Sequence, residues 1–86
     1  MKSNEVVRRE ILQVVENQLR DNQPPETRKT LKRLQDSGIS ESDAKIYIAQ
    51  CVSAEIFNVM KYGKPFDKKR FVKNLTNLPK PPFDDE

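Results

Sequence analysis

The stretch Ser40–Gly63, SESDAKIYIAQCVSAEIFNVMKYG, decides the fold, because it predicts one long helix with apolar residues on nearly every face. At about 100° per residue, one stripe of this helix holds Ala44, Ile48, Cys51, Val52, Ile56 and Val59. A second stripe, on the far side, holds Ile46, Tyr47, Ala54, Phe57 and Met60. A helix that is apolar all round is expected to be buried all round. We therefore expect the other helices, a second copy of the chain or a partner to wrap it.

Three further helices are predicted, over about residues 4–22, 25–37 and 68–78. The first has one apolar face, formed by Val7, Ile11, Val14, Val15 and Leu19. Pro24-Pro25 ends it and starts the second, because proline suits a first helical turn and bars continuation. These elements predict an all-α fold, a compact four-helix domain over residues 1–79 with the long apolar third helix at its centre. A flexible acidic tail is expected over residues 80–86.

Local signals mark where these helices begin and end. The expected N-caps are Ser3 or Asn4, Ser40 and Asp67. Gly38 stands where a left-handed residue is wanted after the second helix, in a Schellman ending. Phe66 is placed to pack on Phe71 across the start of the fourth helix, as a hydrophobic staple.

The composition narrows the class of protein. The 86 residues are 35% hydrophobic and 34% charged, which gives one small core and no room for a deep substrate cavity. No run approaches the roughly 18 apolar residues that cross a bilayer, so we expect no membrane partner. No signal peptide is visible, and the single Cys51 fits a reducing compartment. The expected localisation is therefore cytoplasmic.

The sequence offers few of the residues that catalysis or metal binding requires. The chain has no histidine, which removes the commonest general base and the commonest transition-metal ligand. We expect no cofactor, no metal and no enzymatic activity. An enzyme would need a pocket that gathers Glu55, Lys45 and a basic partner. Glu55 is more simply explained as a structural acid paired with a basic group, for which Arg8 is one candidate, and Cys51 as a core residue.

Basic residues suggest an alternative function. Between Lys64 and Lys80 lie six basic residues and one acid, and three of the basic residues crowd a helix start, where cations are disfavoured. A candidate anion-binding set is Lys64, Lys68, Lys69, Arg70 and Lys73. The simpler reading is a solvated surface that serves solubility. Binding of nucleic acid is the more specific form of the anion-binding hypothesis. Glu41 and Asp43 at the start of the third helix would, however, repel the phosphates of a duplex.

Several short motifs resemble a family of small bacterial helical proteins of unknown function. The matching residues are Glu16-Asn17-Gln18, Pro24-Pro25-Glu26-Thr27-Arg28, Leu31, Leu34, Gly38, Ala44, Glu55-Ile56, Lys64-Pro65-Phe66-Asp67, Arg70 and Leu78-Pro79. They cover about residues 10–79. The resemblance implies a compact helical domain and supplies no activity.

The function expected from these observations is a non-catalytic protein-interaction or self-association module. The second helix is short and narrowly apolar, so part of the long third helix is expected to stay uncovered. The expected interface residues are Ile46, Phe57 and Met60, in a symmetric dimer or against a protein partner. A monomer that buries all three side chains within one chain would refute this hypothesis.

Overall fold

The computed structural model of the protein describes the backbone of residues 2–82 and the side chains of residues 5–82. This part contains four α-helices and no strand: α1 (Lys2–Asp21), α2 (Pro25–Asp36), α3 (Glu41–Tyr62) and α4 (Lys68–Asn77). The predicted all-α, four-helix fold is therefore confirmed. Residues 83–86 of the predicted acidic tail lie outside the described residues.

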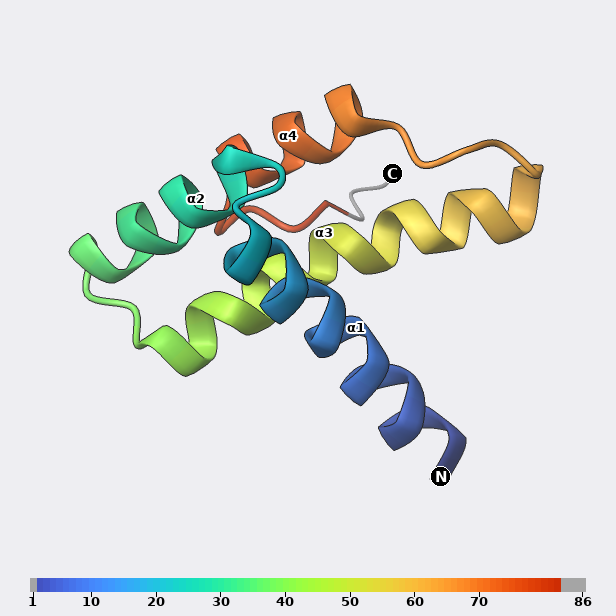
Figure 1. Ribbon diagram of the computed structural model, residues 1–86, viewed down its shortest axis with the longest axis horizontal. Coiled ribbons are helices and arrows are strands. Elements are labelled where there is room, and N and C mark those ends of the chain that lie inside the picture. Colours follow the sequence, from blue (N-terminus) through green and yellow to red (C-terminus); the bar gives the residue numbers. More distant parts are fainter. Residues whose placement is uncertain (1, 83–86) are drawn as a thin grey trace.

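The helices are arranged around α3, which contacts all three others. In Figure 1, α2 and α4 lie next to each other along one side of α3, and α1 crosses α3. From that crossing, the first half of α1 and the second half of α3 diverge and extend out of the helical cluster (Figure 1). Beyond the crossing, α1 and α3 thus diverge like the arms of a V (Figure 1).

All four helices and their flanking residues contribute to one hydrophobic core. Its largest members are Val15, Leu19, Leu31, Leu34, Ile48, Val52, Phe71, Leu75 and Leu78. On α3 the core side chains recur at three- and four-residue spacing from Ala44 to Val52, which is the period that keeps them on one face. The end of α3 beyond Glu55 has no buried residue.

The other helices cover the first half of α3 but leave its second half exposed, in line with the expectation that part of this helix stays uncovered. Phe57, Val59, Met60 and Tyr62 are exposed there. The physical reason is geometric: α3 has 22 residues, whereas α2 has 12 and α4 has 10. Because α1 crosses α3 instead of running beside it, no helix covers the last turns of α3.

The predicted turns between the helices are confirmed. Gly38 has φ +97°, and Ile39 N–H donates to the Leu34 carbonyl at 3.0 Å, which is the Schellman pattern. The Ser40 hydroxyl accepts from the Asp43 N–H at 3.1 Å and caps α3. At the other end of α3, Gly63 adopts φ +68°.

The start of α4 also follows the prediction. The Asp67 carboxylate accepts from the Arg70 N–H at 3.1 Å. The Phe66 and Phe71 rings pack with centroids 5.3 Å apart, which confirms the staple. The start of α1 differs, because its helical backbone begins at Lys2 and already includes Ser3 and Asn4. Neither residue breaks a helix strongly, so the N-cap expected there is wrong.

Two arginines of α2 act as structural clamps. Arg28 donates to the Leu19 carbonyl at the end of α1. Arg33 donates to the carbonyls of Leu75 and Leu78, at 2.9 and 3.0 Å, at the end of α4. The Leu19 and Leu75 carbonyls also accept from the N–H groups of Asn22 and Leu78, at 3.4 and 3.2 Å, and the arginines add a charged donor at each helix end. Part of the basic surface of α2 therefore holds the fold together.

Candidate protein-interaction face

The three expected interface residues lie exposed along one side of α3. Met60 is 80%, Phe57 51% and Ile46 37% exposed. Helical spacing places them, with Ser53, on one stripe that points away from the core-facing stripe of Ala44 and Ile48. The outcome that would refute a dimer, burial of all three, is not what the structure shows. Whether a partner covers them stays a prediction.

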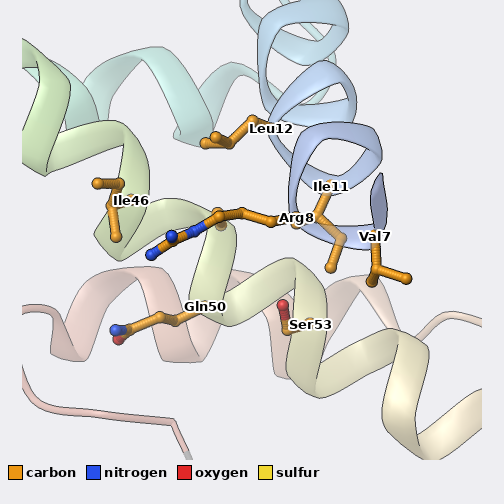
Figure 2. A pocket seen from close by; sticks show the side chains of 8 residues that line it. Val7, Arg8, Ile11, Leu12, Ile46, Gln50 and Ser53 are labelled. Carbon is orange, nitrogen blue, oxygen red and sulfur yellow. The ribbon is translucent and has the colours of Figure 1, made fainter. Parts of the chain in front are cut away.

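The opening between α1 and α3 continues this stripe. A hollow of about 260 Å³ lies there, lined by Val7, Arg8, Ile11, Leu12, Ile46, Ala49, Gln50 and Ser53. Figure 2 shows Arg8 extending from α1 across the hollow, towards the side of α3 that carries Ile46 and Gln50. We name Val7, Ile11, Ile46, Ser53, Phe57 and Met60 the α1–α3 face.

Val7 is the member of this face that the sequence pattern misassigned. It belongs to the apolar stripe of α1 that is expected to pack on the core. In the structure Ile11 of the same stripe is half-buried against the core, as expected, whereas Val7 is about half exposed, because the first half of α1 runs away from α3. Only the crossing of the two helices, which no local pattern encodes, separates the inner part of the stripe from the outer part.

The α1–α3 face has the size and the charge distribution of an interface. Val7, Ile46, Phe57 and Met60 are exposed by 54%, 37%, 51% and 80%, which together leaves on the order of a few hundred Å² of mainly apolar surface. An average specific interface buries about 800 Å² per partner, a little over half of it apolar. Arg8 is the one charged residue that lines the central hollow, and interface centres are depleted of charge.

Glu55 is a structural acid, as expected, but its partner differs. It is fully buried, and Arg70 donates from Nε at 2.6 Å and from Nη2 at 3.0 Å to the two carboxylate oxygens. The Asp67 N–H donates at 2.9 Å to Glu55 Oε1. The expectation of Arg8 as the partner is wrong, because Glu55 faces the start of α4 whereas Arg8 lines the α1–α3 hollow.

This network changes the candidate anion site. The Arg70 guanidinium is already paired, because it donates to the Glu55 carboxylate, and this hydrogen bond raises the pKa of Arg70. The Asp67 carboxylate occupies the helix start, where an anion was expected. The structure brings four of the five expected residues, Lys64, Lys68, Lys69 and Arg70, together around a shallow hollow of about 460 Å³ that is also lined by Pro65, Phe66 and Asp67. Lys73 is exposed but does not line this hollow.

The residues proposed for catalysis are not gathered. Lys45 Nζ lies 2.8 Å from Glu16 and 3.2 Å from Glu41, and the hydrogen bond that Lys45 donates to Glu16 raises the pKa of Lys45. Lys45 and Glu55 thus belong to separate ion pairs. Burial, and to a smaller extent Glu55, raises the pKa of the Cys51 thiol to about 12, so the thiolate that a nucleophile requires is not formed at neutral pH.

Within the described residues, no cluster of three or more histidine, cysteine, aspartate or glutamate side chains has the arrangement of a metal site. No helix between residues 2 and 82 is long and apolar enough to span a membrane. Comparisons of the chain with protein-family models, with curated proteins and with solved structures found no match. The resemblance to a family of small bacterial helical proteins therefore stays a prediction, and the function has to be argued from the geometry.

Proposed function

We propose that this chain is a non-catalytic protein-interaction module that self-associates through the α1–α3 face. One observation carries the proposal: exposed apolar side chains line both sides of the hollow between α1 and α3, and residues 5–82, whose side chains the structure describes, leave them uncovered. Apolar surface of this extent on one face marks a site of contact with another protein.

A second copy is the partner that the charges favour. Residues 5–10 of α1, all exposed, contain Glu5, Arg8, Arg9 and Glu10, which sum to zero charge. Two copies of this segment therefore approach without net repulsion, and each offers both signs to the other. A two-fold contact pairs identical surfaces, so every contact is made twice.

The two protruding helix segments also fit each other. Val6 and Val7 are exposed on the first half of α1. A helical segment as short as this half of the 20-residue α1 is marginally stable in water without a packing partner. In a two-fold dimer, this segment packs against the stripe of Phe57 and Met60 on the partner, and the same contact repeats across the axis. Each copy thus covers the exposed apolar side chains of the other.

Sedimentation equilibrium of the purified chain, between about 1 and 500 μM, tests this proposal. We expect a monomer–dimer equilibrium for the unmodified chain and a monomer for Ile46→Glu and for Met60→Glu, because a buried unpaired carboxylate is costly. Val59→Glu is the matched control, because Val59 is also on α3 and also 37% exposed but lies outside the α1–α3 face. A monomeric unmodified chain at 500 μM, or equal effects of Ile46→Glu and Val59→Glu, would refute self-association.

A further inference from the structure

A second surface lies at the connection from α3 to α4, away from the α1–α3 hollow. Residues 59–69 are all exposed, and the hollow of about 460 Å³ lies within this segment and the first turn of α4. In Figure 1 the connection forms one end of the molecule, where the chain turns back from α3 towards α4. We name Lys64, Phe66, Lys68 and Lys69 the basic corner.

The positive charge of the protein is concentrated at this segment. The charged residues between 59 and 69 are Lys61, Lys64, Asp67, Lys68 and Lys69. Their net charge of +3 equals that of the whole chain, so the rest of the sequence is balanced. Asp67 also lines the hollow, and its carboxylate accepts from the Arg70 N–H, where it caps α4, so four lysines face one acid in this segment. The corner therefore presents its lysines as an attractive site for an anionic partner.

An aromatic ring is fixed among these lysines. Phe66 is 44% exposed, and its inner side packs on the fully buried Phe71 at an interplanar angle of 59°. Phe71 belongs to the core, so it holds the Phe66 ring in place. The connection that carries Phe66 is itself anchored by the Asp67 N–H on the buried Glu55. The ring is thus a preorganised stacking surface at the wall of a basic hollow.

We propose that the basic corner binds single-stranded nucleic acid, with Lys64, Lys68 and Lys69 on the backbone phosphates and an unpaired base stacked on Phe66. Proteins that bind single strands combine positive charge with aromatic stacking surfaces in this way. A duplex fits less well, because its base faces are already stacked and cannot reach the ring. An acidic peptide would use the lysines but gain nothing from a flat aromatic surface.

Fluorescence anisotropy with a labelled ten-nucleotide oligo(dT) or oligo(U) tests this site. Three phosphate contacts on a single strand give a slope of about −2 for log K against log salt. Removing charge with Lys68→Gln/Lys69→Gln should weaken binding about tenfold or more at low salt and reduce the slope to about −0.7. Lys29→Gln/Lys32→Gln, which removes the same charge from α2, is the matched control and should change affinity less than threefold.

Phe66 separates nucleic acid from other anionic partners. Phe66→Leu, which keeps an apolar contact on Phe71, should weaken binding roughly 5- to 100-fold without changing the salt slope. Phe66→Tyr should bind within about twofold of the unmodified chain, which guards against loss of folding as the explanation. Ile46→Glu should bind unchanged, so the outcome is independent of self-association.

Three results would overturn this inference. One is absence of binding at 50 mM salt. Another is equal affinity of Phe66→Leu and the unmodified chain, which would leave only a nonspecific basic surface. The third is equal or tighter binding of double-stranded DNA, polyglutamate or anionic lipid vesicles, each measured in competition with the labelled strand.

Discussion

Removing either partner of the Glu55–Arg70 pair should destabilise the protein by unequal amounts, Arg70→Met more than Glu55→Gln. Arg70→Met leaves the carboxylate of a fully buried Glu55 with one remaining donor, the Asp67 N–H. Glu55→Gln leaves a guanidinium that is 40% exposed and can turn to water. The two variants differ because of burial. A charged group that has lost its partner destabilises the protein more when it is buried, since water cannot hydrogen-bond to it there.

The magnitudes follow from the same contacts. Breaking a buried pair costs about 3–5 kcal/mol. Because Arg70 is partly exposed and Glu55 keeps one hydrogen bond, we expect about 3 kcal/mol for Arg70→Met, at the lower limit of that range. For Glu55→Gln we expect about 1–2 kcal/mol, because the amide oxygen still accepts from the Asp67 N–H, whereas the NH2 group in place of Oε2 can no longer accept from Arg70 Nε.

Urea unfolding followed by circular dichroism gives these free energies, and the double variant closes a double-mutant cycle. We expect the double variant to cost less than the sum of the single changes, because neither charge is then left alone. A Glu55→Gln cost equal to or above that of Arg70→Met would refute the reasoning, as would additivity within about 0.5 kcal/mol.

Other contacts give further expectations. Arg33→Met should lower the free energy of unfolding by about 1–3 kcal/mol in urea titrations, because the carbonyls of the α4 end lose two charged donors; the exposed control Lys29→Met should stay within about 0.5 kcal/mol. Gly38→Ala should lower the free energy of unfolding by about 1 kcal/mol or more in the same assay, and by more than Gly63→Ala does. The reason is that the φ of Gly38, +97°, lies further than that of Gly63, +68°, from the left-handed region open to alanine. Equal losses for the two variants would contradict this expectation. Cys51 should keep its proton in the folded state well above pH 8.5, because burial raises its pKa to about 12, whereas the unfolded thiol titrates near 8.5. Its contribution to stability is therefore complete below about pH 8.5 and declines as the pH rises towards 12, by at most about 1.4 kcal/mol per pH unit. Unfolding of the unmodified chain and of Cys51→Ala between pH 7 and 10 measures this loss, and parallel curves would contradict it.

The features predictable from sequence are those set by neighbouring residues. Gly38, Ser40 and Asp67 act where their local patterns place them, because turn and cap geometry depends on a few consecutive residues. The all-α class followed from the helical periodicity. The expected exposure of Ile46, Phe57 and Met60 required only that the neighbouring helices be short.

The features that escaped prediction depend on how helices cross. No local pattern in the sequence identifies either Arg8 or Arg70 as the partner of Glu55. Arg70 is the partner because α4 packs on α3. The same holds for Val7, which shares a stripe with core residues but lies beyond the point where α1 leaves α3. Arg33 also clamps a carbonyl 45 residues away, a relation that no local pattern contains.

The buried carboxylate of Glu55 has a consequence for the order in which the molecule opens. Glu55 holds the Asp67 N–H, Asp67 caps α4, and Arg70 of the first α4 turn returns to Glu55, so the three interactions form a closed loop. None of them can be released without weakening the other two. The amide hydrogens of the connection and α4 should therefore exchange as one cooperative unit, with one common free energy of opening, and Glu55 should become exposed only when the two detach together.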